Sequence, residues 1–248
     1  MVSIKIQNAR VGFPVYNSSS RSLRLNIISA VGGKLARRDN ITYVDALEGF
    51  SLDVKEGERI ALIGHNGAGK STLLKLISGV YEPTHGKVEV QGKISSLTDI
   101  GLGMDPESTG YDNIIMRLVF MGLTFKEARE KVDGVIDFSE LAAHINLPMR
   151  TYSSGMYLRL AFAVATSVIP DILIMDEMIG AGDASFVEKA RKRSMELVKQ
   201  TKIMVLSSHD LGIVQDLCTR ALWMEKGKII MDGKVKDIIH AYKESVKG

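Results

Sequence analysis

Residues 60–77 read IALIGHNGAGKSTLLKLI, and this stretch decides the fold of the chain. An apolar run of strand length leads into a glycine-rich loop, and a Lys-Ser pair then opens a helix with apolar residues at helical spacing. Glycines let the backbone turn so that successive N–H groups face phosphate oxygens at the positive end of the helix dipole. The order strand, loop, helix therefore predicts a phosphate-binding loop for ATP or GTP.

The residues of this loop are the predicted nucleotide-binding residues. In such a loop the lysine reaches the β- and γ-phosphates, and the hydroxyl after it binds Mg²⁺. We therefore expect ATP and Mg²⁺ as cofactors, with Lys70 on the phosphates and Ser71 on the metal. We interpret His65 and Asn66 as loop residues rather than catalysts. The predicted set is Gly64, His65, Asn66, Gly67, Ala68, Gly69, Lys70, Ser71 and Thr72.

Two further groups of polar residues follow buried apolar runs. Asp176 and Glu177 come directly after residues 172–175, and His209 comes shortly after residues 203–206. Because a doubly wound sheet presents its ligands at the carboxyl ends of its strands, these side chains are expected near the phosphates. We predict Asp176 as a partner of Mg²⁺, and Glu177 and His209 as catalytic residues acting on the attacking water and the γ-phosphate. A solvated acidic turn and a packing histidine are the alternatives.

Composition excludes several classes of protein. With 248 residues, 45% apolar and 25% charged, the chain is ordinary globular material rather than disordered. The net charge of +3 is too weak to indicate a nucleic-acid partner, and none is expected. The single cysteine, Cys218, cannot form an internal disulfide, which favours a reducing compartment. The most apolar region, 160–175, is broken by Pro170 and Asp171 and is shorter than the ~20 residues of a spanning helix.

The pattern of apolar residues predicts an α/β fold with a mainly parallel core sheet. Continuous apolar runs are typical of central strands covered on both faces, whereas strict alternation indicates half-exposed antiparallel strands. The continuous runs are 60–63, 172–175 and 203–206. The alternating runs are 4–6, 50–54 and 87–91. We therefore expect a P-loop core sheet beside a small antiparallel β subdomain.

Two segments depart from this α/β pattern. Residues 110–141 have helical spacing and no strand, so a helical subdomain is expected at about 105–168. Residues 14–42 contain three consecutive serines and five basic residues, and we interpret them as an inserted basic arm. The arm is expected either to lie against anionic lipid or a membrane partner, or to be a solvated loop. The expected organisation is one domain, 1–248.

The sequence TYSSGMYLRLAFAVA at 151–165 places a Ser-Ser-Gly turn at the start of a long apolar helix. Here the chain resembles the ATP-binding cassette (ABC) family, whose signature motif has this form. The other motifs follow in order, with Walker A at 64–72, Walker B at 172–177, a D-loop at 180–183 and the switch histidine His209. The resemblance implies that the signature residues act in trans on the nucleotide of a second copy, and that Asp183 belongs to the D-loop. The signature residues are Ser153, Ser154, Gly155 and Met156.

Within the family, the resemblance is closer to the ATPase subunits of polysaccharide exporters. It rests on MDPESTGYDNI at 104–114, LPMRTYSSGMYLRLAFAVA at 147–165 and DEMIGAGDASF at 176–186. It implies an ATPase that forms a homodimer, works with an integral membrane permease and powers transport of a lipid-linked glycan (O-antigen, capsule or teichoic acid). The implied place is peripheral, on the cytoplasmic face of the inner (cytoplasmic) membrane. An ABC ATPase for another substrate, or outside transport, is the alternative.

Other features of the family differ here or stay open. The family's Q-loop glutamine is absent from LTDIGLGMD at 97–105. Adenine is expected to stack on Phe13, with Tyr16 and Tyr43 as substitutes, although each of these aromatics could instead pack on the small sheet. Longer members carry a carbohydrate-binding domain after the cassette. Because this chain ends at Gly248, we expect either a short member or a chain cut before that domain.

Overall fold

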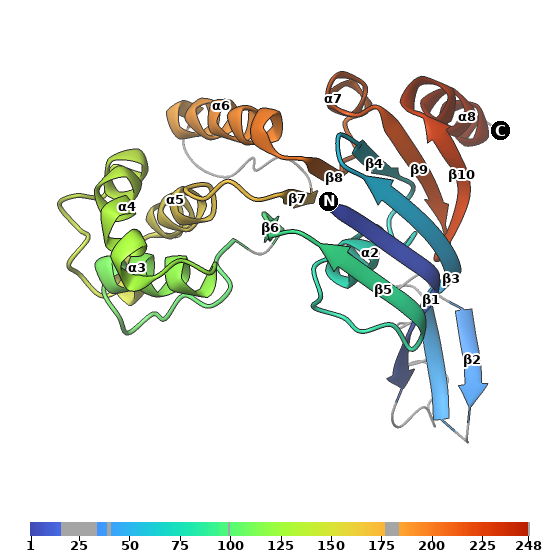
Figure 1. Ribbon diagram of the computed structural model, residues 1–248, viewed down its shortest axis with the longest axis horizontal. Helices are drawn as coiled ribbons and strands as arrows, with labels where there is room; N and C mark the ends of the chain where they lie inside the picture. The colour runs from blue at the N-terminus through green and yellow to red at the C-terminus, as the bar shows by residue number, and fades with distance from the viewer. Residues whose placement is uncertain (16–33, 39–40, 99, 177–183, 248) are drawn as a thin grey trace. The chain divides into compact units, whose positions relative to one another are not determined.

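The computed structural model describes residues 1–15, 34–38, 41–98, 100–176 and 184–247, arranged in two compact units (Figure 1). The first unit takes its described residues from Met1–Ile94, Ile174–Glu177 and Lys202–Gly248. The second takes them from Ser95–Leu173 and Met178–Thr201. Tyr16, Glu177 and Asp183, for which the sequence predicts roles, lie outside the described residues.

A four-stranded antiparallel sheet in the first unit has the order β2-β3-β1-β5. Its strands are β1 (Ser3–Val15), β2 (Lys34–Arg38), β3 (Ile41–Lys55) and β5 (His85–Gln91). In β1 and β3, Ile4 lies opposite Val54 and Ile6 opposite Leu52, and all four side chains are buried while Lys5 and Asp53 are exposed. The alternation in the sequence therefore places one face of this sheet in the core, as predicted.

The second sheet has six strands in the order β10-β9-β4-β8-β7-β6. They are β4 (Arg59–Ile63), β6 (Ile94–Ser96), β7 (Ile172–Asp176), β8 (Ile203–Ser207), β9 (Arg220–Glu225) and β10 (Lys228–Lys234). β4 runs parallel to β8 and β9, and β10 is antiparallel to β9. The continuous apolar runs of β4, β7 and β8 are buried, and the parallel pairing of β4 with both of its neighbours confirms the predicted mainly parallel core. The chain leaves the first unit after Ile94 in β6 and returns to it at Ile174 in β7.

The described residues of the first unit form three helices: α2 (Lys70–Ile77), α7 (Leu211–Leu217) and α8 (Val235–Lys247). α8 packs beside β9 and β10 through Ile238 and Ile239, which are buried, and Tyr242 meets Trp223 edge-on at 5.8 Å (Figure 1). Asp210 caps α7 by accepting hydrogen bonds from the N–H groups of the first turn. α2 contacts β3, β5 and β8, and α7 packs against α8.

The second unit is mainly helical (Figure 1). It contains α3 (Gly110–Phe120), α4 (Phe125–Ser139), a 3-10 turn (Met149–Thr151), α5 (Ser154–Ala165) and α6 (Ala184–Gln200). Thr109 and Thr124 cap α3 and α4, and Glu127 completes a capping box at Thr124. The apolar stripes of α3, α4 and α5 meet in one core that includes Leu118 and Val132. The helical spacing of 110–141 thus corresponds to two capped helices.

Part of the basic arm extends the antiparallel sheet. β2 pairs with the outer end of β3, so that Lys34 lies opposite Asp45 and Arg38 opposite Ile41. The rest of the arm, 16–33 and 39–40, lies outside the described residues. Among the residues that are described, none of the helices has the length and apolar character needed to cross a bilayer.

A candidate nucleotide-binding site

The glycine-rich loop between β4 and α2 is packed tightly against neighbouring backbone. Gly69 caps α2 with a φ of 101°, and a Cβ atom there would lie 2.9 Å from the carbonyl oxygen of Ala46. A Cβ atom at Gly64 would overlap the carbonyl oxygen of Met224. Both positions therefore require glycine, for their positive φ and for the close approach of neighbouring backbone.

Lys70 lies within this loop and is buried. Its Nζ donates to the carbonyl oxygens of Gly64 at 2.7 Å and His65 at 3.1 Å. The loop thus holds its own ammonium group in place, at the start of a helix with no acidic residue in its first turn. This arrangement concentrates positive potential where phosphate oxygens would bind.

Ser71 and Asp176 come together from two different elements. The Ser71 hydroxyl, in the first turn of α2, donates to Asp176 Oδ2 at 2.8 Å, and Asp176 ends β7. A hydroxyl and a carboxylate oxygen are hard ligands of the kind that Mg²⁺ takes, together with waters and substrate phosphates. In the described part of the chain no cluster of three or more His, Cys, Asp or Glu could hold a metal ion. The hydroxyl and carboxylate of this pair fit a Mg²⁺ whose other ligands are waters and phosphate oxygens.

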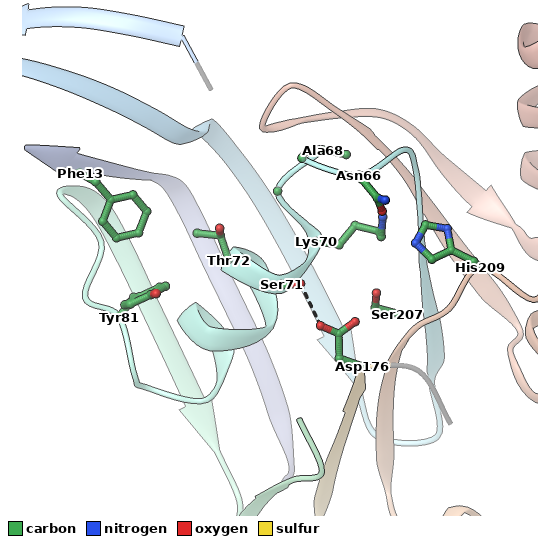
Figure 2. A pocket seen from close by; sticks show the side chains of 12 residues that line it. Phe13, Asn66, Ala68, Lys70, Ser71, Thr72, Tyr81, Asp176, Ser207 and His209 are labelled. Atoms are coloured by element: carbon green, nitrogen blue, oxygen red, sulfur yellow. Dashed lines mark hydrogen bonds between the residues drawn. The ribbon is translucent and has the colours of Figure 1, made fainter. Parts of the chain in front are cut away.

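These residues line a cleft of about 700 Å³ in the first unit (Figure 2). Its lining includes the loop from Asn66 to Thr72, Asp176, Ser207 and His209. His209 is exposed just beyond the end of β8, and Figure 2 shows it on the same side of the loop as Asp176 and Ser207. The structure thus brings the predicted residues of three strand ends to one cleft. Gly64 and His65 belong to the same loop but do not line the cleft.

The other side of the cleft carries two aromatic rings. Phe13 and Tyr81 meet edge to face, with ring centroids 5.2 Å apart and planes at 74° (Figure 2). The structure thus places Phe13 where a base could stack, whereas Tyr43 is not in the cleft lining. Sequence reasoning missed Tyr81. The sequence signal that could have identified Tyr81 is an aromatic residue between the helix after the glycine-rich loop and Pro83.

The signature turn lies in the second unit. Ser153 caps α5, its hydroxyl accepting from the N–H of Met156 at 3.2 Å, and the side chains of Ser153 and Ser154 are exposed. Among the described residues, and apart from its chain neighbours and its own helix backbone, an added Cβ atom at Gly155 would come within 4 Å only of Ser153 Oγ, at 3.9 Å. The described geometry is thus an open helix start that can accept an anion.

Comparisons with known proteins were made next. Residues 47–180 match the family model described as ABC transporter. The chain is 42% identical over 231 residues to an O-antigen export system ATP-binding protein, RfbE, of Yersinia enterocolitica, covering 92% of this chain and 97% of that protein. It is 44% identical over 214 residues to RfbB of Myxococcus xanthus, covering 86% of this chain and 49% of that protein. It is also 34% identical over 245 residues to the teichoic acids export ATP-binding protein TagH of Bacillus cereus. That match covers 99% of this chain and 43% of TagH.

The chain therefore spans about half of the length of the Myxococcus and Bacillus proteins and nearly all of the Yersinia protein. Among solved structures, a dimeric ATP-binding cassette bound to ADP and Pi has a TM-score of 0.68 at 21% identity, covering 94% of this chain and 98% of that chain. The ATP binding subunit of an ABC transporter has a TM-score of 0.70 at 20% identity, covering 97% and 93%. These two likenesses confirm the predicted fold.

Proposed function

Since the chain belongs to the ABC transporter family, we propose that it powers export of a lipid-linked polysaccharide across the cytoplasmic membrane. Membership of this family makes it an ATPase. The chain is similar to the Yersinia O-antigen export protein along nearly the whole length of that protein. This similarity supports O-antigen or a related glycan as the substrate. The similarity to TagH extends that choice to teichoic acid.

We assign the nucleotide to the cleft in the first unit. The loop N–H groups and Lys70 bind the β- and γ-phosphates, and Phe13 stacks on adenine. Ser71 and Asp176, joined by a 2.8 Å hydrogen bond, would hold Mg²⁺. When bound, Mg²⁺ neutralises the charge that develops between the β- and γ-phosphates.

For hydrolysis, Glu177 follows directly on Asp176 in the sequence and is assigned to orient a water and accept its proton. His209, on the cleft wall, contacts the γ-phosphate. Both assignments rest on chain position and on the cleft lining.

The signature turn is proposed to complete the site of a second copy. Each chain offers one phosphate loop and one open helix start at Ser153–Gly155, so a head-to-tail homodimer would contain two equivalent sites. ATP holds this dimer closed through contacts that need the γ-phosphate, and hydrolysis removes them. Asp183 is assigned to the same dimer interface. Residues 1–248 would act together as one cassette.

The proposed partner is an integral membrane permease that carries the glycan, with the cassette bound at the cytoplasmic face of the inner membrane. The support is that the relatives are named as export systems, in which an ATP-binding protein is one component. ATP-driven closing and opening of the cassette dimer would supply the permease with its two conformations.

The test is rescue of export in cells that lack the chain. Wild-type protein should restore the surface polysaccharide, measured by immunoblotting, and clear the lipid-linked precursor, measured by mass spectrometry. Lys70→Ala should do neither at equal protein level because it loses phosphate binding. Lys126→Ala, at an exposed position of α4, is the control and should rescue fully. Normal surface polysaccharide in cells without the chain would contradict the proposed substrate.

A further inference from the structure

A tyrosine in the first turn of α5 reaches out of its helix to a neighbouring segment. α5 begins at Ser154, and the Tyr157 N–H donates to the Ser153 carbonyl at 2.9 Å. The Tyr157 hydroxyl donates to the carbonyl oxygen of Gly101 at 2.9 Å. Gly101 belongs to segment 100–104, which follows β6 along the chain, so both partners lie in the second unit.

Position 101 needs glycine because the ring of Tyr157 leaves no room for a Cβ atom, and not because of a positive φ. A Cβ atom at Gly101 would lie 2.5 Å from Tyr157 Oη, 2.7 Å from Cε1 and 2.9 Å from Cζ. Gly101 is not among the glycines with positive φ, whereas Gly103 has a φ of 79°. An alanine at position 101 would therefore not need a left-handed backbone, and its nearest obstacle would be the ring of Tyr157.

A second side chain holds the same segment. Arg117, on α3, donates from Nη2 to the carbonyl oxygen of Ile100 at 3.5 Å, and its Nη1 would lie 3.3 Å from a Cβ atom at Gly103. Burial lowers the pKa of the Arg117 guanidinium, and Tyr157 opposes that shift. Segment 100–104 has no glutamine. The hydrogen bonds from Arg117 and Tyr157 are accepted by the main-chain carbonyls of Ile100 and Gly101, and Met104 packs against the helical core.

We propose that Tyr157 is a positioning residue that sets the direction of the signature turn through segment 100–104. The direction of the free N–H groups at the start of α5 depends on how its first turn is rotated, and the Ser153 cap acts only within that turn. The Tyr157 ring also packs on the helical core, so the hydroxyl links that turn to both the core and the segment. A shift of the segment would therefore turn the signature residues. This inference rests on the proposed function, in which those residues meet the ATP of a second copy.

The experiment uses Glu177→Gln as the background, because that variant should accumulate ATP-bound dimers. Light scattering measures the protein concentration at which half of the chains dimerise with ATP. Adding Tyr157→Phe should raise that concentration about fivefold, the effect of losing one hydrogen bond. Affinity for fluorescent mant-ADP, which lacks the γ-phosphate, should change less than twofold. The melting temperature should fall no further than with Tyr152→Phe, which loses the 2.9 Å bond from Tyr152 Oη to the His144 carbonyl.

The partner side is tested with Gly101→Ala in the same background. It should weaken dimerisation severalfold when Tyr157 is present and have no added effect when Tyr157 is replaced by alanine, because the obstructing ring is then gone. Equal effects in both cases would overturn the proposal. An unchanged dimerisation midpoint with Tyr157→Phe, or a loss matched by mant-ADP affinity, would also overturn it. Failure of Glu177→Gln itself to dimerise would overturn the proposed function instead.

Discussion

Replacing Ser71 by alanine should weaken binding of the Mg²⁺ complex of ATP far more than binding of free ATP. The Ser71 hydroxyl donates to Asp176 Oδ2 at 2.8 Å, and this pair is the proposed protein share of the metal site. Loss of one of two ligands, at about 1.5–3 kcal/mol for a contact with a charged group, corresponds to roughly 10- to 100-fold in affinity. Because Ser71 is exposed, the free energy of unfolding should fall by no more than about 1 kcal/mol.

The assay is fluorescence titration with mant-ATP, once with Mg²⁺ and once with EDTA. Ser71→Ala should lose affinity only in the presence of Mg²⁺, and Ser71→Thr, which keeps a hydroxyl, should recover most of it. An equal loss with and without Mg²⁺ would refute the assignment, since the hydroxyl would then act on the phosphates or on the loop. A large drop in melting temperature would show that the hydrogen bond to Asp176 serves folding instead.

Three further predictions concern other parts of the first unit. His209→Ala should lower kcat by at least tenfold with little change in mant-ADP affinity, whereas His240→Ala, at an exposed site of α8, should leave turnover unchanged. Phe13→Ala should raise KM for ATP severalfold with a smaller effect on kcat, and Phe13→Tyr should restore it, because stacking serves substrate and transition state alike. Burial raises the pKa of the Cys218 thiol from 9.0 to about 12, so the unfolded chain loses this proton first. The free energy of unfolding should therefore be fully maintained below pH 9 and fall as pH rises toward 12, less so in Cys218→Ala, as urea titrations at each pH would show.

The sequence predicts those parts of the site that depend on local order along the chain. The loop from Gly64 to Ser71 needs only a strand before it and a helix after it, and both can be read from apolar periodicity. Asp176 and His209 follow buried runs, and parallel strands bring their carboxyl ends to the same edge. The meeting of Ser71 with Asp176, 105 residues apart, is thus a consequence of strand order.

The features that sequence reasoning missed depend on contacts between distant segments. Tyr81 reaches the cleft because its loop lies beside Phe13, and nothing in the spacing of the two residues fixes that. α6 belongs to the second unit because Phe186 packs edge-on against Phe162 at 6.0 Å and Phe138 at 5.9 Å. The polar sequence KLARR of β2 has no apolar alternation, so its pairing with β3 could not be predicted.

The contacts of Lys70 predict that nucleotide binding needs no large rearrangement of the loop. A buried ammonium group without acceptors would be costly, and here the carbonyls of Gly64 and His65 accept its protons. The loop keeps this shape because Gly64 and Gly69 are packed against the backbones of Met224 and Ala46. In the proposed site, phosphate oxygens would therefore meet a charge that is already desolvated and oriented, and little reorganisation would oppose binding. It follows that Lys70→Ala should remove affinity for nucleotide while leaving the loop, which is held by its glycines, in place.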